Sequence, residues 1–225
     1  MSNDTILLII KFKIGGSLRF LSHAETLKFF QRACVRAGID MQYSRGFNPR
    51  PKLSLPLPRT VGVASDEDIL CLRASHYLKG QRVTGYESRI RAELAGQLPG
   101  DCELLSVETS RENISYQPTS AIYIFPLRSE YINIEVKKKI ELLMERDSCN
   151  LRRRMDAKKV KFKNVDVRPF LISIELVDSK IIVECKISPE GTIRVDEILE
   201  LLELNTESLT GPIKRTNVKW LVGKA

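Results

Sequence analysis

Apolar residues recur along the first half of the chain with two periods, one typical of strands and one typical of helices. The runs with strand character are 5–13, 60–63, 68–74 and 102–109. The runs with helical spacing are 22–37 and 85–97. Thr84 and Glu87 have capping-box spacing at the start of the second helix. We expect the two central strands to pair as a hairpin, which gives the order β-α-β-β-α-β.

The second half shows the same succession with one extra strand. Its expected strands are 121–127, 171–177, 180–187 and 214–222. The range 158–167 is expected to be a basic strand or loop. Its expected helices are 131–146 and 195–204. The residues expected to face inward from the first of these helices are Ile134, Ile140, Leu143 and Met144.

Polar composition separates the two halves. The stretch 111–120 contains few apolar residues and predicts a linker. Each half has the element order of a split β-α-β unit. We therefore predict an α+β fold of two tandem ferredoxin-like units with antiparallel sheets, one over 1–110 and the other over 121–225.

Bulk composition is that of an ordinary globular protein. The chain has 225 residues, of which 43% are hydrophobic and 28% charged, and no run approaches the ~20 apolar residues of a membrane span. The apolar run Ile6–Ile10 is too short for the core of a signal peptide. We expect a cytoplasmic protein that does not associate with membranes.

Five scattered cysteines and two histidines restrict the chemistry of the chain. The cysteines, none of them in a CxxC spacing, are Cys34, Cys71, Cys102, Cys149 and Cys185. This pattern predicts no disulfide framework and no zinc or iron–sulfur site. The sequence also lacks a phosphate-binding loop, a dinucleotide fingerprint and a nucleophile elbow. We expect neither a metal nor a cofactor.

Positive charge is concentrated in two segments. The net charge is +8, and residues 1–60 hold ten Lys or Arg against three acidic residues. Residues 137–168 hold twelve Lys or Arg against five acidic residues. An uneven basic distribution favours a phosphate-bearing partner. We expect the cations of the first segment to converge in one groove when the chain folds.

The first predicted helix carries a line of cations. Ser22 and Glu25 have the spacing of a capping box, which would begin the helix. Lys28, Arg32 and Arg36 follow at four-residue spacing and therefore share one side of the helix. We predict that this side contacts phosphates. The alternative is an ordinary solvated helix face.

The proline-rich loop after this helix is the strongest binding candidate. Arg45, Arg50 and Lys52 can contact phosphates, while Tyr43 and Phe47 can stack on bases. Prolines reduce the entropy that such a loop loses on binding. The alternative is a rigid connection whose aromatic residue, Phe47, packs into the core.

A second basic zone lies in the other half of the chain. Its candidate residues are Arg152, Arg153, Arg154, Lys159, Lys161 and Lys163. The three lysines alternate, so a strand would place them on one side, where they can contact phosphates without sequence specificity. The alternative is an edge strand that lysines protect from aggregation.

Several motifs resemble one protein family. They are RFLSH at 19–23, RA at 32–33, RAG at 36–38, YSRGFNPRPK at 43–52 and VGVAS at 61–65. This pattern is similar to that of the radical-SAM-linked protein family, whose members occur beside, or fused to, a cobalamin-binding-type radical SAM protein. The chain has Glu25, Arg45 and Arg50 where the family pattern has Asp, Gln and a second His. The resemblance implies a radical SAM partner and a role connected with RNA.

The leading hypothesis is an RNA-binding accessory protein, without catalysis of its own, that presents ribosomal or transfer RNA to a radical SAM partner. One alternative is a metal-independent endoribonuclease in which His23, in the first turn of the helix, is the general acid or base. The layout of two predicted ferredoxin-like units resembles that of the RAMP repeat-processing endoribonucleases. Another alternative is an adaptor that binds the radical SAM protein directly.

Overall fold

The computed structural model describes residues 5–78, 81–82, 84–154 and 162–224. Over these residues the fold is mixed α+β, which confirms that part of the prediction. The chain divides into a first unit, Met1–Pro118 with Trp220–Ala225, and a second unit, Thr119–Lys219. The last residues therefore belong to the first unit and not, as expected, to the second. No helix in the described part of the chain has the length and apolar character of a membrane span.

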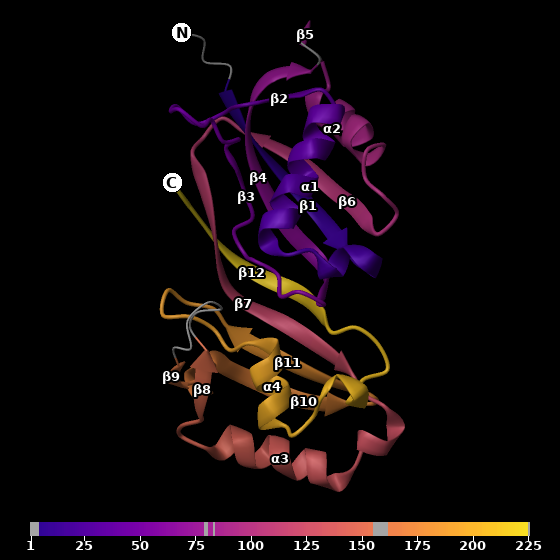
Figure 1. Cartoon of the computed structure of the whole chain (residues 1–225), viewed down its shortest axis with the longest axis vertical. Helices are drawn as coiled ribbons and strands as arrows, with labels where there is room; N and C mark the ends of the chain where they lie inside the picture. The colour runs from indigo at the N-terminus through magenta and orange to yellow at the C-terminus, as the bar shows by residue number, and fades with distance from the viewer. Residues whose placement is uncertain (1–4, 79–80, 83, 155–161, 225) are drawn as a thin grey trace. The chain divides into compact units, whose positions relative to one another are not determined.

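In the first unit β1 has a strand on each side. The elements are β1 (Thr5–Ile14), η1 (Gly16–Phe20), α1 (His23–Arg36), β2 (Ile39–Met41), β3 (Leu53–Ser54), β4 (Ala64–Leu78), β5 (Gln81–Arg82), α2 (Tyr86–Ala95) and β6 (Cys102–Ser110). β1 pairs antiparallel with β4 and with β6, and the short strands β2, β3 and β5 pair with β4 (Figure 1). Because β1 occupies one edge of β4, β2 and β3 lie along its other edge.

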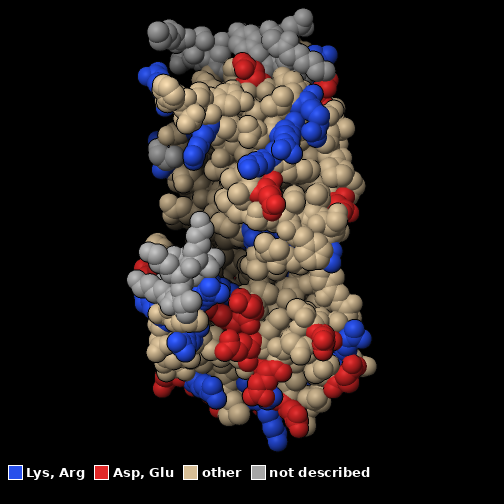
Figure 2. Space-filling model, in the orientation of Figure 1, with Lys and Arg blue, Asp and Glu red and all other residues tan. Residues whose placement is uncertain are grey.

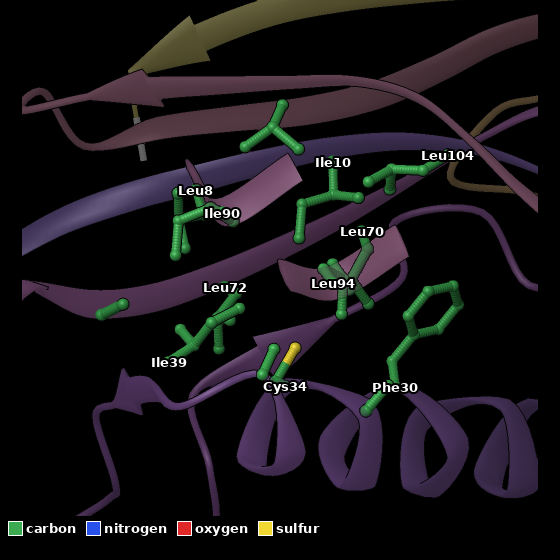
Figure 3. Packing of buried hydrophobic residues seen from close by; sticks show 14 of the residues in the cluster. Leu8, Ile10, Phe30, Cys34, Ile39, Leu70, Leu72, Ile90, Leu94 and Leu104 are labelled. Atoms are coloured by element: carbon green, nitrogen blue, oxygen red, sulfur yellow. The ribbon is translucent and has the colours of Figure 1, made fainter. Parts of the chain in front are cut away.

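The helices α1 and α2 cover one face of this sheet. Figure 3 shows Phe30 and Cys34 pointing from α1 toward the strands. The strand residues buried in the same cluster include Leu8, Ile10, Phe12, Leu70 and Leu72. Ile90 and Leu94 contribute the buried side of α2. This face holds the main core of the first unit.

The alternate residues of the same strands form a smaller cluster on the opposite face. Leu7, Ile9 and Ile69 are its buried members, because successive residues of a strand point to opposite sides. The partly buried residues packed against them are Cys71, Ile114, Tyr116 and Trp220. No residue of α1 or α2 belongs to this cluster among the described residues, and we refer to this side as the open face.

The second unit contains a sheet in which four strands follow one another in the order β10-β11-β7-β12, and a separate two-stranded sheet. Its elements are β7 (Ile114–Pro126, from Thr119), η2 (Ser129–Tyr131), α3 (Ile134–Glu145), β8 (Asn150–Arg154), β9 (Phe162–Asp166), η3 (Arg168–Phe170), β10 (Leu171–Val177), β11 (Lys180–Lys186), α4 (Val195–Leu201), η4 (Thr206–Ser208) and β12 (Lys214–Lys224, to Lys219). β11 pairs antiparallel with β10 and β7, and β8 pairs with β9. The hairpin expected around Asp178 is confirmed, with Val177 opposite Lys180.

The hairpin expected over 60–63 and 68–74 is wrong. Residues 60–63 form a turn in which the Val63 N–H donates to the Thr60 carbonyl at 3.1 Å. Gly62 has a φ of +88°, a conformation that a regular strand does not use. A single long strand, β4, starts immediately after this turn.

The expected linker over 111–120 is mostly strand. β7 begins at Ile114, and its first residues belong to the first unit. Ile114 and Tyr116 alternate toward the open face and pack against its apolar cluster. The stretch 111–120 contains too few apolar residues for the two-residue period of a half-buried strand to be recognised in the sequence.

Two expected details of the helices are also wrong. α2 begins after Gly85, which has a φ of 65° and provides no side-chain cap, whereas Glu87 accepts from the Thr109 N–H and hydroxyl at 2.7 and 2.6 Å. In α3 the expected inward residue Ile134 is 64% exposed, and Val136 is buried in its place. Glu87 therefore joins α2 to β6 rather than capping its own helix.

Candidate nucleic-acid interface

The loop between β2 and β3 closes on itself. Tyr43 and Pro51 form an isolated antiparallel bridge, and we call the segment from Tyr43 to Pro51 the finger loop. Inside it, the Ser44 N–H donates to the Arg50 carbonyl at 2.8 Å, and the Arg50 N–H donates to Ser44 Oγ at 3.0 Å. These contacts hold the two arms together, so the loop has a defined shape before any ligand is bound.

The tip of the finger loop presents an aromatic ring to solvent. Phe47 has 103% relative exposure, and Gly46 before it has a φ of +143°, which favours glycine. Burying a phenylalanine side chain contributes roughly 1.5–3 kcal/mol, and the fold forgoes that contribution here. The expectation that Phe47 packs into the core as an alternative to binding is therefore wrong.

Cations flank this ring. Arg45 and Arg50 are both exposed, and no acidic side chain pairs with either of them among the described residues. Tyr43, at the base of the loop, is 44% exposed. The sequence-predicted residues Tyr43, Arg45, Phe47 and Arg50 therefore lie together on one exposed loop. Such a set can contact phosphates with its guanidinium groups and bases with its rings.

Backbone hydrogen bonds fix the base of the finger loop to β4. The Gln42 N–H donates to the Arg73 carbonyl at 2.8 Å, and the Lys52 N–H donates to the Gln42 carbonyl at 2.7 Å. The Arg73 N–H in turn donates to the Lys52 carbonyl at 2.9 Å. Lys52, the last predicted residue of this group, therefore lies where the loop joins the sheet.

A pocket of about 510 Å³ lies beside this junction. Its lining residues are Leu7, Pro51, Lys52, Leu53, Ser54, Pro56, Cys71, Arg73, Asn113, Ile114, Ser115 and Tyr116. Sequence reasoning missed Arg73 and Tyr116 as candidates. Arg73 alternates with the buried Leu72 and Ala74 along β4, and that alternation was the available signal that Arg73 points to the open face.

The capping box at the start of α1 is confirmed. Ser22 N–H donates to Glu25 Oε2 at 2.9 Å, and the Glu25 N–H donates to Ser22 Oγ at 3.3 Å. The hydrogen bonds from Ser22 hold the pKa of Glu25 below its usual value. These two residues are therefore explained by helix initiation.

The line of cations on α1 is exposed but only partly available. Lys28, Arg32 and Arg36 lie on the outer side of the helix, where Figure 2 shows blue side chains over α1. Arg36 donates from Nε to Gln97 Oε1 and from a terminal nitrogen to the Gln97 carbonyl, both at 3.1 Å. Arg36 thus joins α1 to the segment that follows α2. Lys28 and Arg32 are the members that face solvent.

The α1 cations and the finger loop do not form one groove. Arg36 lies against the segment that follows α2. The finger loop instead connects β2 and β3, which lie along the edge of β4 that faces away from β1 (Figure 1). Figure 2 shows blue side chains at that margin of the first unit, separate from those over α1. The expected convergence of the first basic segment is therefore wrong, and the finger loop is the more complete site.

His23 is the first residue of α1 and is half-buried. Its Nδ1 is buried and has no hydrogen-bond partner within the described parts of the chain. In the same parts, no group of three or more His, Cys, Asp or Glu side chains is placed to hold a metal ion.

The second basic zone contains a buried ion pair. Arg153 Nε and a terminal nitrogen each lie 2.6 Å from an oxygen of Glu197, a bidentate geometry. Arg153 also donates to the Thr192 carbonyl at 2.9 Å. The side chains of Arg153 and Glu197 are only 11% and 7% exposed. Arg153 therefore stabilises the second unit and does not face a ligand.

The other members of this zone are heterogeneous. The Arg152 guanidinium lies 4.3 Å from the centre of the Phe162 ring, a cation–π contact across the β8–β9 pair. Arg154 and Lys163 are exposed. Lys159 and Lys161 lie outside the described residues. The zone thus retains exposed positive charge, but its most buried cation has an internal partner.

The fold and these sites define an α+β protein with an exposed basic and aromatic loop. A family model described as "Uncharacterized protein conserved in bacteria (DUF2344)" matches residues 8–203, and the chain belongs to this family. No curated protein sequence matches the chain.

One solved structure that is similar is the acetolactate synthase small subunit from Thermotoga maritima. It shares 10% sequence identity, with 98% of each chain covered and a TM-score of 0.27. At that TM-score the similarity supports no argument about fold or function.

Proposed function

We propose that this protein is an RNA-binding accessory protein whose finger loop contacts single-stranded RNA. The observation that carries the proposal is the fully exposed Phe47 at the tip of a closed loop, between the exposed cations Arg45 and Arg50. An aromatic ring offers a stacking surface to any base, and flanking guanidinium groups neutralise the phosphates on either side. A loop with a preformed shape loses little entropy when it binds.

The strand order supports the proposal that each unit is ferredoxin-like. In the first unit the order is β6-β1-β4-β2, with α1 and α2 as the connecting helices. In the second unit the order is β12-β7-β11-β10, with α3 and α4 in the equivalent places. Ferredoxin-like sheets leave one face without helices, and RNA-binding modules of this architecture use that face.

The radical SAM partner enters the proposal through the sequence resemblance alone. In this proposal the protein holds ribosomal or transfer RNA and presents it to the partner enzyme, which performs the chemistry. The finger loop supports the RNA-binding step because its exposed groups lack a partner within the described residues. Copurification of the two proteins after nuclease treatment, with no affinity for RNA, would instead favour a protein-binding adaptor.

The test measures RNA affinity against salt. Fluorescence anisotropy with a labelled single-stranded RNA and with a transfer RNA, over a series of KCl concentrations, gives the slope of log affinity against log salt. Each phosphate contact with a single strand contributes about −0.7 to that slope. We expect the Arg45→Ala, Arg50→Ala double variant to flatten the slope by about 1.4, which is twice that contribution.

The matched control is the Lys137→Ala, Lys138→Ala double variant, which removes two exposed cations of α3 in the second unit. We expect it to keep the wild-type slope. Equal slopes for the two double variants would overturn the finger-loop proposal, as would binding to anionic vesicles without binding to RNA. Cleavage of the RNA by the wild type and not by His23→Ala would favour the endoribonuclease alternative.

A further inference from the structure

The pocket beside the finger loop belongs to the open face of the first unit's sheet. Its apolar floor includes Leu7 of β1, Cys71 of β4, and Ile114 and Tyr116 of β7. These residues all belong to the cluster opposite α1 and α2. The volume of about 510 Å³ lies within the ~300–1,000 Å³ that is usual for small-ligand sites. A single nucleotide therefore fits in it.

The charges around this pocket favour an anion. Its lining includes the cations Lys52 and Arg73 and no Asp or Glu. Neither cation has an ion-pair partner in the part of the chain that the structure describes. Two unpaired cations on a partly apolar surface attract a phosphate more strongly than the same cations would in bulk water.

The aromatic member of the pocket is held by its neighbour. The Tyr116 ring meets the Trp220 ring edge to face, with the ring centres 6.1 Å apart. Burial raises the pKa of Tyr116, and the Glu108 carboxylate adds to this effect, so its hydroxyl stays protonated at neutral pH. Tyr116 thus offers both a ring face and a hydroxyl donor to a ligand.

The pocket and the finger loop form one continuous structure. Pro51 closes the loop through its bridge with Tyr43 and also lines the pocket. Lys52 follows directly, and its carbonyl accepts the N–H of Arg73, the second pocket cation, at 2.9 Å. The loop and the pocket therefore share Pro51, with Arg50 directly before it in the chain and Lys52 directly after it.

We propose that this pocket holds one nucleotide of the RNA strand that the finger loop binds, with its phosphate near Lys52 and Arg73 and its base against Tyr116 and Ile114. This inference rests on the proposed RNA-binding function and adds a second contact point to it. Aromatic side chains on an otherwise open sheet are a recurrent platform for single-stranded RNA. The Ser54 and Ser115 hydroxyls in the lining can contact the edge of the base.

Cys71 provides a direct test because it lines the pocket. It is partly exposed, while Cys34, Cys102, Cys149 and Cys185 are buried. Burial raises the pKa of its thiol to about 11, so alkylation with N-ethylmaleimide is followed at mildly alkaline pH. The rate of Cys71 labelling, read by mass spectrometry, is compared for the wild type alone, with a saturating single-stranded RNA, and with adenosine monophosphate.

We expect the RNA to slow Cys71 labelling at least roughly fivefold. The Lys52→Ala, Arg73→Ala double variant should bind the RNA about tenfold more weakly or worse and lose most of this protection, as expected from losing charge-assisted contacts. The Lys137→Ala, Lys138→Ala variant should keep both the wild-type RNA affinity and the protection of Cys71. A far-ultraviolet circular dichroism spectrum and a melting temperature equal to those of the wild type show that the pocket variant is still folded. Its own ligand-free labelling rate is the reference for protection, because removing Arg73 also removes a charge that lowers the pKa of Cys71.

The outcomes separate the two proposals. RNA binding with unprotected Cys71 overturns the pocket assignment and leaves the finger-loop function standing. Protection by adenosine monophosphate without any RNA binding overturns the RNA assignment of both sites and leaves a nucleotide pocket. Protection by neither ligand overturns the pocket assignment, and the anisotropy measurement then decides the fate of the finger loop separately.

Discussion

The two basic segments of this chain use their arginines in opposite ways. In the finger loop of the first unit, Arg45 and Arg50 face solvent beside the exposed Phe47. In the second unit, Arg153 is buried in a bidentate pair with Glu197. The two segments have the same excess of positive charge in the sequence. A surplus of cations therefore indicates a binding surface only after the internal partners of each cation are known.

The first basic segment also contains both kinds of arginine, one buried with internal partners and others exposed. Arg59 is 9% exposed, and one of its terminal nitrogens donates to the Arg19 and Val63 carbonyls at 2.6 and 2.8 Å. Asp68 lies 3.9 Å from its Nε. Arg59 thus joins the residues before α1 to the start of β4, although the sequence places it in the same basic loop as Arg50. Its neighbours in sequence are no guide to its role.

The largest expected effect comes from breaking the buried pair. Arg153→Ala leaves the buried Glu197 carboxylate without its cation and with only the Arg194 N–H still donating to it, so we expect a loss of about 3 kcal/mol in the free energy of unfolding. Urea denaturation followed by far-ultraviolet circular dichroism measures this loss. Arg152→Ala, which removes an exposed cation–π contact, should cost only about 0.5–1 kcal/mol.

RNA affinity of the Arg153 variant, measured where it is folded, should equal that of the wild type. A variant with unchanged stability and reduced RNA affinity would remove the contrast between the two segments. It would place Arg153 in a binding surface instead.

The next effect concerns the exposed ring of the finger loop. Phe47→Ala should reduce the free energy of RNA binding by about 1–3 kcal/mol, the range for losing one stacked base. The melting temperature of the Phe47→Ala variant should equal that of the wild type, because the Phe47 ring makes no core contact. The matched control is Phe20→Ala, since Phe20 is 56% exposed and lies under the Arg19 guanidinium at 4.2 Å. Equal losses of affinity in both variants would show that the finger loop has no special role.

A smaller effect distinguishes two cations of the same helix. Arg36→Ala should lower the free energy of unfolding by about 1 kcal/mol through the loss of its bonds to Gln97. Arg32→Ala should leave stability unchanged, because Arg32 faces solvent. If α1 also contacts phosphates, only Arg32→Ala will flatten the salt slope of RNA binding, by about 0.7. A larger loss in the free energy of unfolding for Arg32→Ala than for Arg36→Ala would contradict this assignment.

The smallest effect is the pH response of the capping box. The pKa of Glu25 is lowered in the folded chain by hydrogen bonds from Ser22, so its contribution to stability is present above the ordinary value of 4.5. That contribution is lost as pH falls from 4.5 through the lower folded pKa. Glu25→Gln should therefore lose less stability than the wild type over this acid range. Thermal melts between neutral and acid pH measure the difference, and parallel curves would sink the prediction.

Local patterns in the sequence predicted local features well. The capping box at Ser22 and the hairpin at Asp178 both depend on residues close in the chain, and both are confirmed. The mixed α+β class followed from apolar periods in the same way. The turn at Gly62, read as part of a hairpin, shows that β-branched residues alone do not establish a strand.

Features that depend on distant residues could not be predicted. Glu197 is 44 positions from Arg153, and nothing in either neighbourhood indicates the pair. The pocket requires the register that places Ser54 opposite Cys71, together with the start of β7, which looked like a linker. The finger-loop residues were predicted because they are contiguous, whereas Arg73 and Tyr116 join them only through the sheet.

The edge-to-face contact of Tyr116 and Trp220 gives the first unit an intrinsic optical reporter. Trp220 is the single tryptophan of the chain, and Tyr116 next to it lines the pocket. Indole emission depends on nearby rings, so a base that stacks on Tyr116 will change the emission spectrum without any attached dye. Titration in a spectrofluorimeter therefore follows the occupancy of this one pocket, while Arg153 and its partner in the other unit contribute no signal.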